Sequence, residues 1–250
     1  YYTVPARYDD AVTMAHILKY CCIDTYVDVA GLEFTRTYFP KLFYFEGEWH
    51  YRNNGSFELG TAEGGRKIFL MGMNYLSEYM NSREALNYYY LHTIHHEFTH
   101  ILHQTVEFST AYQLITTDYK SDKCFNSEFK DFLSRGFITD YAQKNYHEDF
   151  AEMVATYVTS TADEWEALLK KAEYGALKDK NGDFVVDSEG SVKIDTKVKA
   201  DGRDLIEQKL SIMRSYMQDQ WGIDIDELRA SILQRENDVV NGKIDLKNLD

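Results

Sequence analysis

The order of apolar and polar positions along the chain predicts a mainly helical protein. Between residues 9 and about 29, apolar side chains recur at three- and four-residue steps, which places them on one buried face of a helix. A second such stretch, residues 82–108, contains neither Gly nor Pro. The same spacing predicts further helices at residues 147–160, 163–174, 204–218 and 225–234.

Short runs rich in aromatic or β-branched residues predict strands at residues 41–46, 56–62 and 66–71. Asn and Gly residues at positions 53–55 and a Gly pair at 64–65 separate these runs and are typical of turns. We therefore expect a small antiparallel sheet before the helix at residues 82–108.

A second β element is expected in the second half of the chain. The acidic sequence DKNGD at residues 179–183 lacks the ligand spacing of an EF-hand calcium loop. We interpret it as a turn that leads into a surface hairpin at residues 184–186 and 192–194.

Two helix starts resemble capping boxes, in which the first side chain caps the helix and the Glu three residues later bonds back. These pairs are Asn81 with Glu84, and Asn145 with Glu148. They predict where the helices at residues 82–108 and 147–160 begin.

The composition limits the class of protein. A chain of 250 residues can bury a sizeable core, and its net charge of −14 argues against a nucleic-acid-binding surface. The three cysteines form neither a disulfide framework nor a CxxC site, so we expect buried free thiols. No apolar run reaches the roughly 18 residues of a membrane span. The chain opens at Tyr1, and we expect it to be trimmed, so that any targeting segment would have been removed.

The sequence His96-Glu97-Phe98-Thr99-His100 has the HExxH pattern of zinc peptidases. On a helix, His96 and His100 project from the same face and can bind one metal ion. Glu97 leaves the helix at a different angle and is placed to act as a general base toward a water at the metal. The motif lies inside the helix predicted at residues 82–108, as this chemistry requires.

Further histidines lie beside the motif. His92, His96, His100 and His103 fall on one stripe of the predicted helix, and His95 lies next to it. Only His96 and His100 enclose a glutamate in the general-base position. We therefore expect the other three to be packed neutral histidines or supports of the metal ligands.

A catalytic zinc needs a third protein ligand and keeps its fourth position for water. Candidates lie in the sequence YAQKNYHEDFAE at residues 141–152. Glu148 and Glu152 share one helix face because they are four residues apart. From the residues alone, His147, Glu148, Asp149 and Glu152 all remain candidates.

The two motifs together resemble the gluzincin metallopeptidases of the anthrax lethal-factor type. Those enzymes carry HEFxH followed by YAQxNxxExFAE, which matches residues 96–100 and 141–152. The resemblance implies that Glu148 is the third zinc ligand. It also implies that Glu152 is a carboxylate that contacts the ligands without binding the zinc itself. It also implies that the Tyr141 hydroxyl stabilises the developing oxyanion.

Most of the chain also resembles a narrower family, the zinc metallopeptidase lipoproteins associated with TonB-dependent nutrient importers. The similar stretches are VPA at residues 4–6, GTAEGG at 60–65, HHEFTHILHQ at 95–104, and 200–222, which ends in QWG. The resemblance implies an outer-membrane lipoprotein of the cell envelope, held by a lipid on an N-terminal cysteine that is absent here. An outer-membrane nutrient importer is then the implied partner.

The sequence thus predicts one α+β, mainly helical zincin-like domain over residues 1–250. A sheet-containing part at 1–80 precedes a helical catalytic and C-terminal part at 81–250. We expect one Zn²⁺ per chain, held by His96, His100 and Glu148, and hydrolysis of a peptide or glycoprotein substrate. Glu97 is the expected base, Tyr141 the oxyanion donor, and Glu152 the side chain that orients a ligand histidine.

The alternative is a cell-surface accessory that binds glycans or peptides for an importer. Its metal site would be vestigial or structural. A structural zinc site usually has four protein ligands, and His103 or His147 could supply the fourth. The presence of Glu97 and Tyr141 favours the enzyme, because a structural site needs neither residue.

Overall fold

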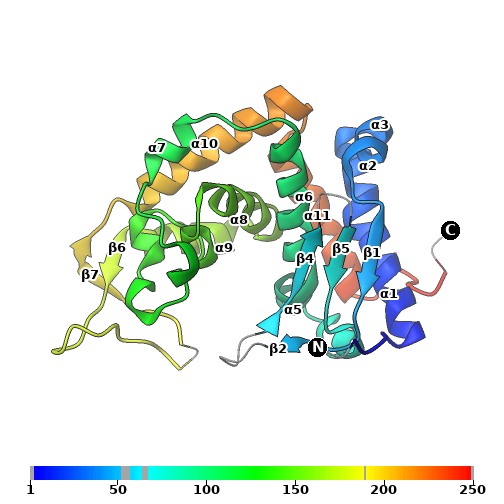
Figure 1. The fold of residues 1–250 in the computed structure, drawn as a ribbon, viewed down its shortest axis with the longest axis horizontal. Helices are drawn as coiled ribbons and strands as arrows, with labels where there is room; N and C mark the ends of the chain where they lie inside the picture. Colours follow the sequence, from blue (N-terminus) through cyan, green and yellow to red (C-terminus); the bar gives the residue numbers. More distant parts are fainter. Residues whose placement is uncertain (1–2, 52–56, 64–66, 189, 249–250) are drawn as a thin grey trace. The chain divides into compact units, whose positions relative to one another are not determined.

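A computed structural model of the protein describes residues 3–51, 57–63, 67–188 and 190–248 (Figure 1). The chain divides into two compact units. The first unit comprises Tyr1–Val106 and Trp221–Asp250, and the second comprises Glu107–Gln220. The single-domain organisation stays a prediction.

The first unit joins N-terminal helices and a small sheet to one long helix and a C-terminal helix. Its elements in chain order are α1 (Tyr8–Leu18), η1 (Lys19–Ile23), α2 (Asp24–Ala30), α3 (Leu32–Tyr38), β1 (Leu42–Phe45), β2 (His50–Tyr51), β3 (Phe57–Glu58), β4 (Gly60–Glu63), β5 (Lys67–Leu70), η2 (Met73–Tyr75), α4 (Leu76–Tyr79), α5 (Arg83–Leu86), η3 (Asn87–Leu91), α6 (His92–Thr105) and α11 (Ile225–Val240).

The helix expected at residues 9–29 is present as α1, a π-helical turn η1 and α2 in succession. Met14, Ile17 and Tyr26 lie on its inner face with no more than 1% of their surface exposed. Burying such apolar surface is what stabilises an amphipathic helix inside a protein.

The sheet has the strand order β1-β5-β4. Strand β4 runs antiparallel to β5, as expected, but β1 runs parallel to β5, so the sheet is mixed. The long connection between β1 and β5 allows β5 to run in the same direction as β1, which the local sequence pattern does not show. The turn signals at residues 53–55 and 64–65 lie outside the described residues.

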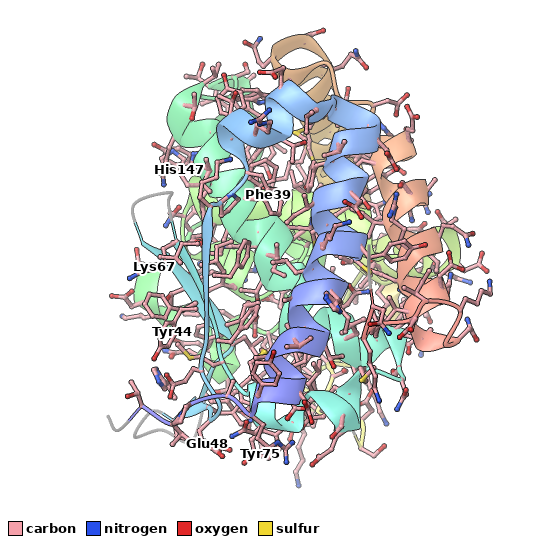
Figure 2. All side chains as sticks on the ribbon, turned by 90° about the vertical axis from the view of Figure 1, so that its right-hand side faces the viewer. Phe39, Tyr44, Glu48, Lys67, Tyr75 and His147 are labelled. Atoms are coloured by element: carbon pink, nitrogen blue, oxygen red, sulfur yellow. The ribbon has the colours of Figure 1, made fainter. Side chains whose placement is uncertain are left out.

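The two faces of the sheet differ in character. Ile68 and Leu70 point inward and are fully buried, whereas Tyr44 is 41% exposed. Figure 2 shows Tyr44 and Lys67 on the outer side of the strands and Phe39 between the sheet and the helices. This alternation follows from the two-residue repeat of a strand.

The stretch predicted as one helix at residues 82–108 is a continuous helical run from Arg83 to Thr105. Its middle part, η3, is π-helical, and such segments are frequent near functional sites. The capping-box prediction for Asn81 was wrong, because Ser82 is the N-cap and its hydroxyl accepts a hydrogen bond from the Ala85 backbone. Serine is as good a cap as asparagine, so the local pattern could not separate the two.

The second unit contains helices, short 3-10 turns and one hairpin. Its elements in chain order are α7 (Ala111–Ile115), η4 (Ser121–Lys123), η5 (Ser127–Phe129), η6 (Phe132–Arg135), η7 (Tyr141–Gln143), α8 (Tyr146–Thr159), α9 (Ala162–Ala172), β6 (Tyr174–Ala176), β7 (Ile194–Lys199) and α10 (Gly202–Trp221), whose last residue belongs to the first unit.

The hairpin expected at residues 184–186 and 192–194 is present, with Val186 paired to Val192. Strands β6 and β7 extend it in antiparallel pairing. In the preceding turn, Asp179 accepts hydrogen bonds from the backbone of Asn181 and Asp183. The interpretation of this acidic stretch as a turn is therefore confirmed.

The prediction of a mainly helical α+β fold is confirmed. The three cysteines are buried free thiols, as expected. Among the described residues, no helix combines the length and apolar character that crossing a membrane would require.

A buried ion pair joins α8 to α10 inside the second unit. The Lys209 ammonium lies 2.6 Å from Asp149 Oδ2, and both side chains are fully buried. Lys209 also donates to the Gly136 carbonyl at 2.7 Å and lies 4.4 Å from the centre of the Phe137 ring. Tyr119 donates a further hydrogen bond to Asp149 at 3.0 Å. Asp149 Oδ2 thus accepts from both Lys209 and Tyr119, which offsets part of the cost of burying the pair.

Replacing Lys209 by Met should leave the Asp149 carboxylate buried without its counter-charge. We expect Lys209→Met to lower the free energy of unfolding by about 3–5 kcal/mol, measured by urea titration. The exposed Lys178 provides the control, since Lys178→Met should change the free energy of unfolding by no more than about 0.5 kcal/mol. A loss below about 1 kcal/mol for Lys209→Met would show that the pair contributes little to stability.

Candidate metal centre

Helix α6 is fixed on one side by an aromatic core. Phe98 is fully buried, and its ring lies edge-on to those of Tyr26 and Phe39, with ring centres 4.8 and 4.9 Å away. Aromatic pairs in this arrangement add to the stabilisation from area burial alone. Because Phe98 lies between the two motif histidines in sequence, this packing sets the direction in which they leave the helix.

His95 belongs to the packed side of α6. It is fully buried, and its Nδ1 lies 3.2 Å from the Tyr26 hydroxyl. Burial, with a smaller contribution from His92, lowers the pKa of His95 to about 3. His95 is therefore neutral at physiological pH.

His96 and His100 converge on one side of α6. Their Nε2 atoms lie 3.0 Å apart, and their ring centres are 4.6 Å apart. Two nitrogens bound to one zinc at about 2.0–2.1 Å in near-tetrahedral geometry would be about 3.3 Å apart, so the pair fits a zinc ion. Glu97 follows His96 in the same helical turn.

His103 supports this pair from the next turn of α6. Its Nε2 lies 2.7 Å from His100 Nδ1, the ring nitrogen on the side away from His96. Metal-binding histidines commonly use their second nitrogen in such a hydrogen bond, which fixes the ring orientation. The His92 ring is farther away, with its centre 6.4 Å from that of His96.

The second unit carries the other predicted site residues around the start of α8. Asn145 is the N-cap, as predicted, and its Oδ1 accepts hydrogen bonds from the backbone of His147 and Glu148. The Glu148 side chain makes a different contact from that of a capping box. Its Oε1 accepts hydrogen bonds from Tyr141 at 3.0 Å and from Lys144 at 2.9 Å.

Tyr141, Lys144 and Glu148 form a closed triangle of polar contacts. The Lys144 ammonium also donates to the Tyr141 hydroxyl oxygen, at 2.9 Å. Burial and the charge of Glu148 outweigh the effect of Lys144 and raise the pKa of Tyr141 to about 12. Burial opposes the charge on Lys144, but hydrogen bonds to Tyr141 and Glu148 prevail and raise its pKa. The phenol is therefore protonated and the lysine charged at neutral pH.

Glu152 lies one turn farther along α8, on the same face as Glu148. Its Oε2 accepts a hydrogen bond from Thr139 at 2.7 Å. The same Thr139 hydroxyl accepts from the backbone of Ala142, inside the turn that carries Tyr141. One threonine thus connects the Tyr141 turn to the Glu152 carboxylate.

The remaining ligand candidates are engaged elsewhere in the second unit. Asp149 forms the buried ion pair with Lys209 described above. His147 Nε2 lies 3.2 Å from a carboxylate oxygen of Glu107, and its ring contacts that of Phe108. These contacts distinguish both residues from Glu148, whose carboxylate lies beside the Tyr141 hydroxyl.

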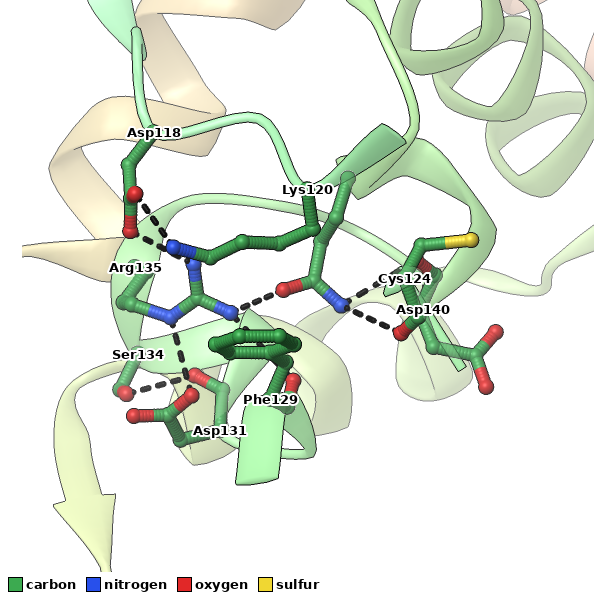
Figure 3. A network of polar contacts seen from close by, with 9 residues as sticks. Asp118, Lys120, Cys124, Phe129, Asp131, Ser134, Arg135 and Asp140 are labelled. Atoms are coloured by element: carbon green, nitrogen blue, oxygen red, sulfur yellow. Dashed lines mark hydrogen bonds and ion pairs between the residues drawn. The ribbon is translucent and has the colours of Figure 1, made fainter. Parts of the chain in front are cut away.

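A polar network holds the turn that carries Tyr141 (Figure 3). The Arg135 guanidinium donates to Asp131, Asp118 and the Gln143 side chain. The buried Gln143 amide in turn donates to the backbone carbonyls of Cys124 and Asp140. Several turns without regular hydrogen-bond ladders are joined in this way, which fixes the backbone on both sides of Tyr141.

The sequence pattern did not predict that Lys144, Thr139 and the Arg135 network belong to this region. A signal existed for Lys144, because it precedes Glu148 by four residues, a spacing at which opposite charges on a helix pair. Thr139 carries no such signal. Arg135 follows Asp131 at the same spacing, but its contacts with Asp118 and Gln143 depend on how the turns fold.

Comparison with known proteins identifies the family. Residues 1–226 match the family described as "Putative zinc-binding metallo-peptidase". The chain belongs to this family. The description agrees with the two convergent histidine nitrogens on α6, and it makes zinc binding the expected property of the chain.

A solved structure supports the same family and fold. It is the crystal structure of a protein from Bacteroides caccae that is described as a putative zinc-binding metallo-peptidase. The two sequences are 31% identical, the match covers 98% of this chain and 83% of that one, and the TM-score is 0.75. A search of curated proteins found no match at the significance required.

The contact between His103 and His100 predicts a supporting role in metal binding. Removing such a partner typically weakens metal affinity by about 10–100-fold. We therefore expect His103→Ala to bind zinc with an affinity reduced by about that factor, measured by competition with a chelator, whereas His100→Ala should lose tight binding. His16→Ala, outside α6, is the control. An unchanged affinity of His103→Ala would contradict the supporting role.

Proposed function

We propose that the protein is a zinc-dependent peptidase of the gluzincin type, with His96, His100 and Glu148 as the metal ligands. The observation that carries the proposal is the 3.0 Å distance between His96 Nε2 and His100 Nε2. Glu97 lies between these two histidines in the sequence. Family membership supports zinc as the metal. The His₂Glu donor set is one that catalytic zinc sites use.

The choice of Glu148 as third ligand rests on three arguments. It occupies the ligand position in the lethal-factor-like motif, seven residues after Tyr141. Its carboxylate lies beside the Tyr141 hydroxyl, the group expected near the reacting centre. Asp149, in contrast, would have to give up a fully buried ion pair in order to bind a metal.

A zinc ion at these residues would supply Lewis acidity, which lowers the pKa of water and polarises a peptide carbonyl. Glu97 acts as the general base: it accepts the proton of the attacking water and passes it to the leaving amine. The Tyr141 hydroxyl donates a hydrogen bond to the carbonyl oxygen as that oxygen becomes negative. With its raised pKa of about 12, Tyr141 keeps the proton that this bond needs.

Glu152 is proposed to orient a ligand histidine by accepting a hydrogen bond from it. The bond from Thr139 holds one oxygen of this carboxylate in place. Glu152 then acts on the reaction only through the histidine.

The accessory-protein alternative requires a metal site closed by four protein ligands. His103 and His147 were the candidates for the fourth ligand. His103 Nε2 contacts His100 Nδ1, and His147 Nε2 lies beside Glu107. A closed site would need one of these histidines to bind the metal as the fourth ligand. In both histidines Nε2 instead contacts another side chain, and this favours the enzyme.

Location and partner are proposals that rest on the resemblance alone. We infer a lipoprotein of the outer membrane, attached by a lipid on an N-terminal cysteine outside this sequence. Its substrate would be a peptide or glycoprotein, cleaved beside a TonB-dependent nutrient importer.

The general-base role predicts that Glu97→Gln keeps zinc but loses hydrolysis. Glutamine is nearly isosteric with glutamate and cannot accept the proton. We expect kcat to fall by about 10²–10⁴-fold, measured on peptides found by profiling cleavage in a mixed protein and glycoprotein digest. Glu33→Gln, on the exposed surface of α3, is the control.

Metal content must be measured with the same variants. Glu97→Gln should retain one zinc per chain, whereas Glu148→Ala should bind zinc much more weakly. Activity of Glu97→Gln within a few-fold of the parent protein would remove Glu97 from the mechanism and favour the accessory role.

The oxyanion role of Tyr141 predicts a different kinetic pattern. Tyr141→Phe keeps the aromatic ring, which stacks with Phe125, but loses the hydroxyl. We expect kcat and kcat/KM to fall together, by about 2–4 kcal/mol in activation free energy, with KM little changed. Tyr174→Phe serves as the control. Near-normal rates of Tyr141→Phe would show that this tyrosine only packs.

A further inference from the structure

Lys144 has no role in the proposed mechanism, although it contacts Tyr141 and Glu148, which both have one. It lies immediately before the N-cap of α8, and 32% of its side chain is exposed. Its ammonium is 2.9 Å from the Tyr141 hydroxyl oxygen and 2.9 Å from Glu148 Oε1. It also lies 4.9 Å from the centre of the Tyr141 ring.

Helix energetics do not explain a lysine at this position. A cation near the N-terminus of a helix opposes the helix dipole. The order lysine followed by glutamate is also the weaker arrangement for a four-residue pair. The contact with Tyr141 therefore accounts for Lys144 better than stabilisation of α8 does.

The chemistry of the phenol indicates what the lysine contributes. A tyrosine hydroxyl donates one hydrogen bond and can accept others through its lone pairs. Tyr141 now donates to Glu148 Oε1, so it must redirect its proton in order to stabilise an oxyanion. The bond from Lys144 uses a lone pair of the hydroxyl oxygen, so it can persist while the proton turns to a new acceptor.

We propose that Lys144 is a positioning residue for Tyr141, whose ammonium holds the hydroxyl oxygen in place while its proton is donated to the oxyanion. The inference rests on the proposed function, because it assumes that Tyr141 acts on the oxyanion. A hydrogen bond accepted from an ammonium also polarises the hydroxyl and strengthens the bond that it donates.

The test compares Lys144→Met, which keeps the length of the side chain, with Lys144→Arg, which keeps the charge and the donors. A small misplacement of a catalytic group can cost about 10²-fold in rate. We expect Lys144→Met to lower kcat by about 10–100-fold with KM within about threefold of the parent, and Lys144→Arg to restore most of the loss. Lys199→Met is the control, because Lys199 packs over the ring of Tyr174.

A double-mutant cycle separates positioning from a structural role. If Lys144 acts through the Tyr141 hydroxyl, adding Lys144→Met to Tyr141→Phe should lower kcat by less than about twofold. The same fold loss in both backgrounds would overturn the proposal, as would a normal kcat for Lys144→Met.

A readout without catalysis makes the proposal independent of the search for a substrate. In metal-free protein with ¹³Cζ-labelled tyrosine, the Tyr141 resonance is the one missing from Tyr141→Phe. It should shift in Lys144→Met and stay in place in Lys199→Met. If the Tyr141 resonance does not shift in Lys144→Met, the role of Lys144 is overturned. Normal activity of Glu97→Gln would instead overturn the proposed function. The shift would then still show whether Lys144 contacts the Tyr141 hydroxyl.

Discussion

The packing of Phe98 against Tyr26 and Phe39 is the constraint on which the position of the two motif histidines depends. A helix has one rotation about its axis that buries its apolar stripe. Once Phe98 is buried, the 3.6-residue repeat directs His96 and His100 to a common side, and their Nε2 atoms come to lie 3.0 Å apart. Two histidines held in this way would need little rearrangement to bind a metal.

Polar contacts fix the start of α8 in a similar way. The Asn145 cap sets the first turn, and the buried contact of Asp149 with Lys209 sets its rotation. Because Glu148 precedes Asp149 by one residue, it leaves the helix about 100° away and cannot share the same buried partner. The position of Glu148 beside Tyr141 is therefore a consequence of where Asp149 is anchored.

The sequence predicted those parts of the fold that local periodicity controls. The HExxH spacing predicted the shared histidine face, and apolar repeats predicted α1, α2, α6 and the helices after residue 145. The N-cap at Ser82 and the parallel pairing of β1 with β5 were not predicted. The cap is a choice between two adjacent residues of similar propensity, and strand direction is set by distant segments.

The same distinction applies within the candidate site. Lys144 lies in the motif itself, yet its bond to the Tyr141 hydroxyl arises because η7 folds back toward the start of α8. The turn owes that shape to Arg135 and Gln143, whose contacts span residues 118–143. A motif therefore specifies which chemical groups are present, while the surrounding network decides which of them touch. A residue at a variable position of the family pattern, such as Lys144, can in this way become part of the environment of a residue that the pattern specifies.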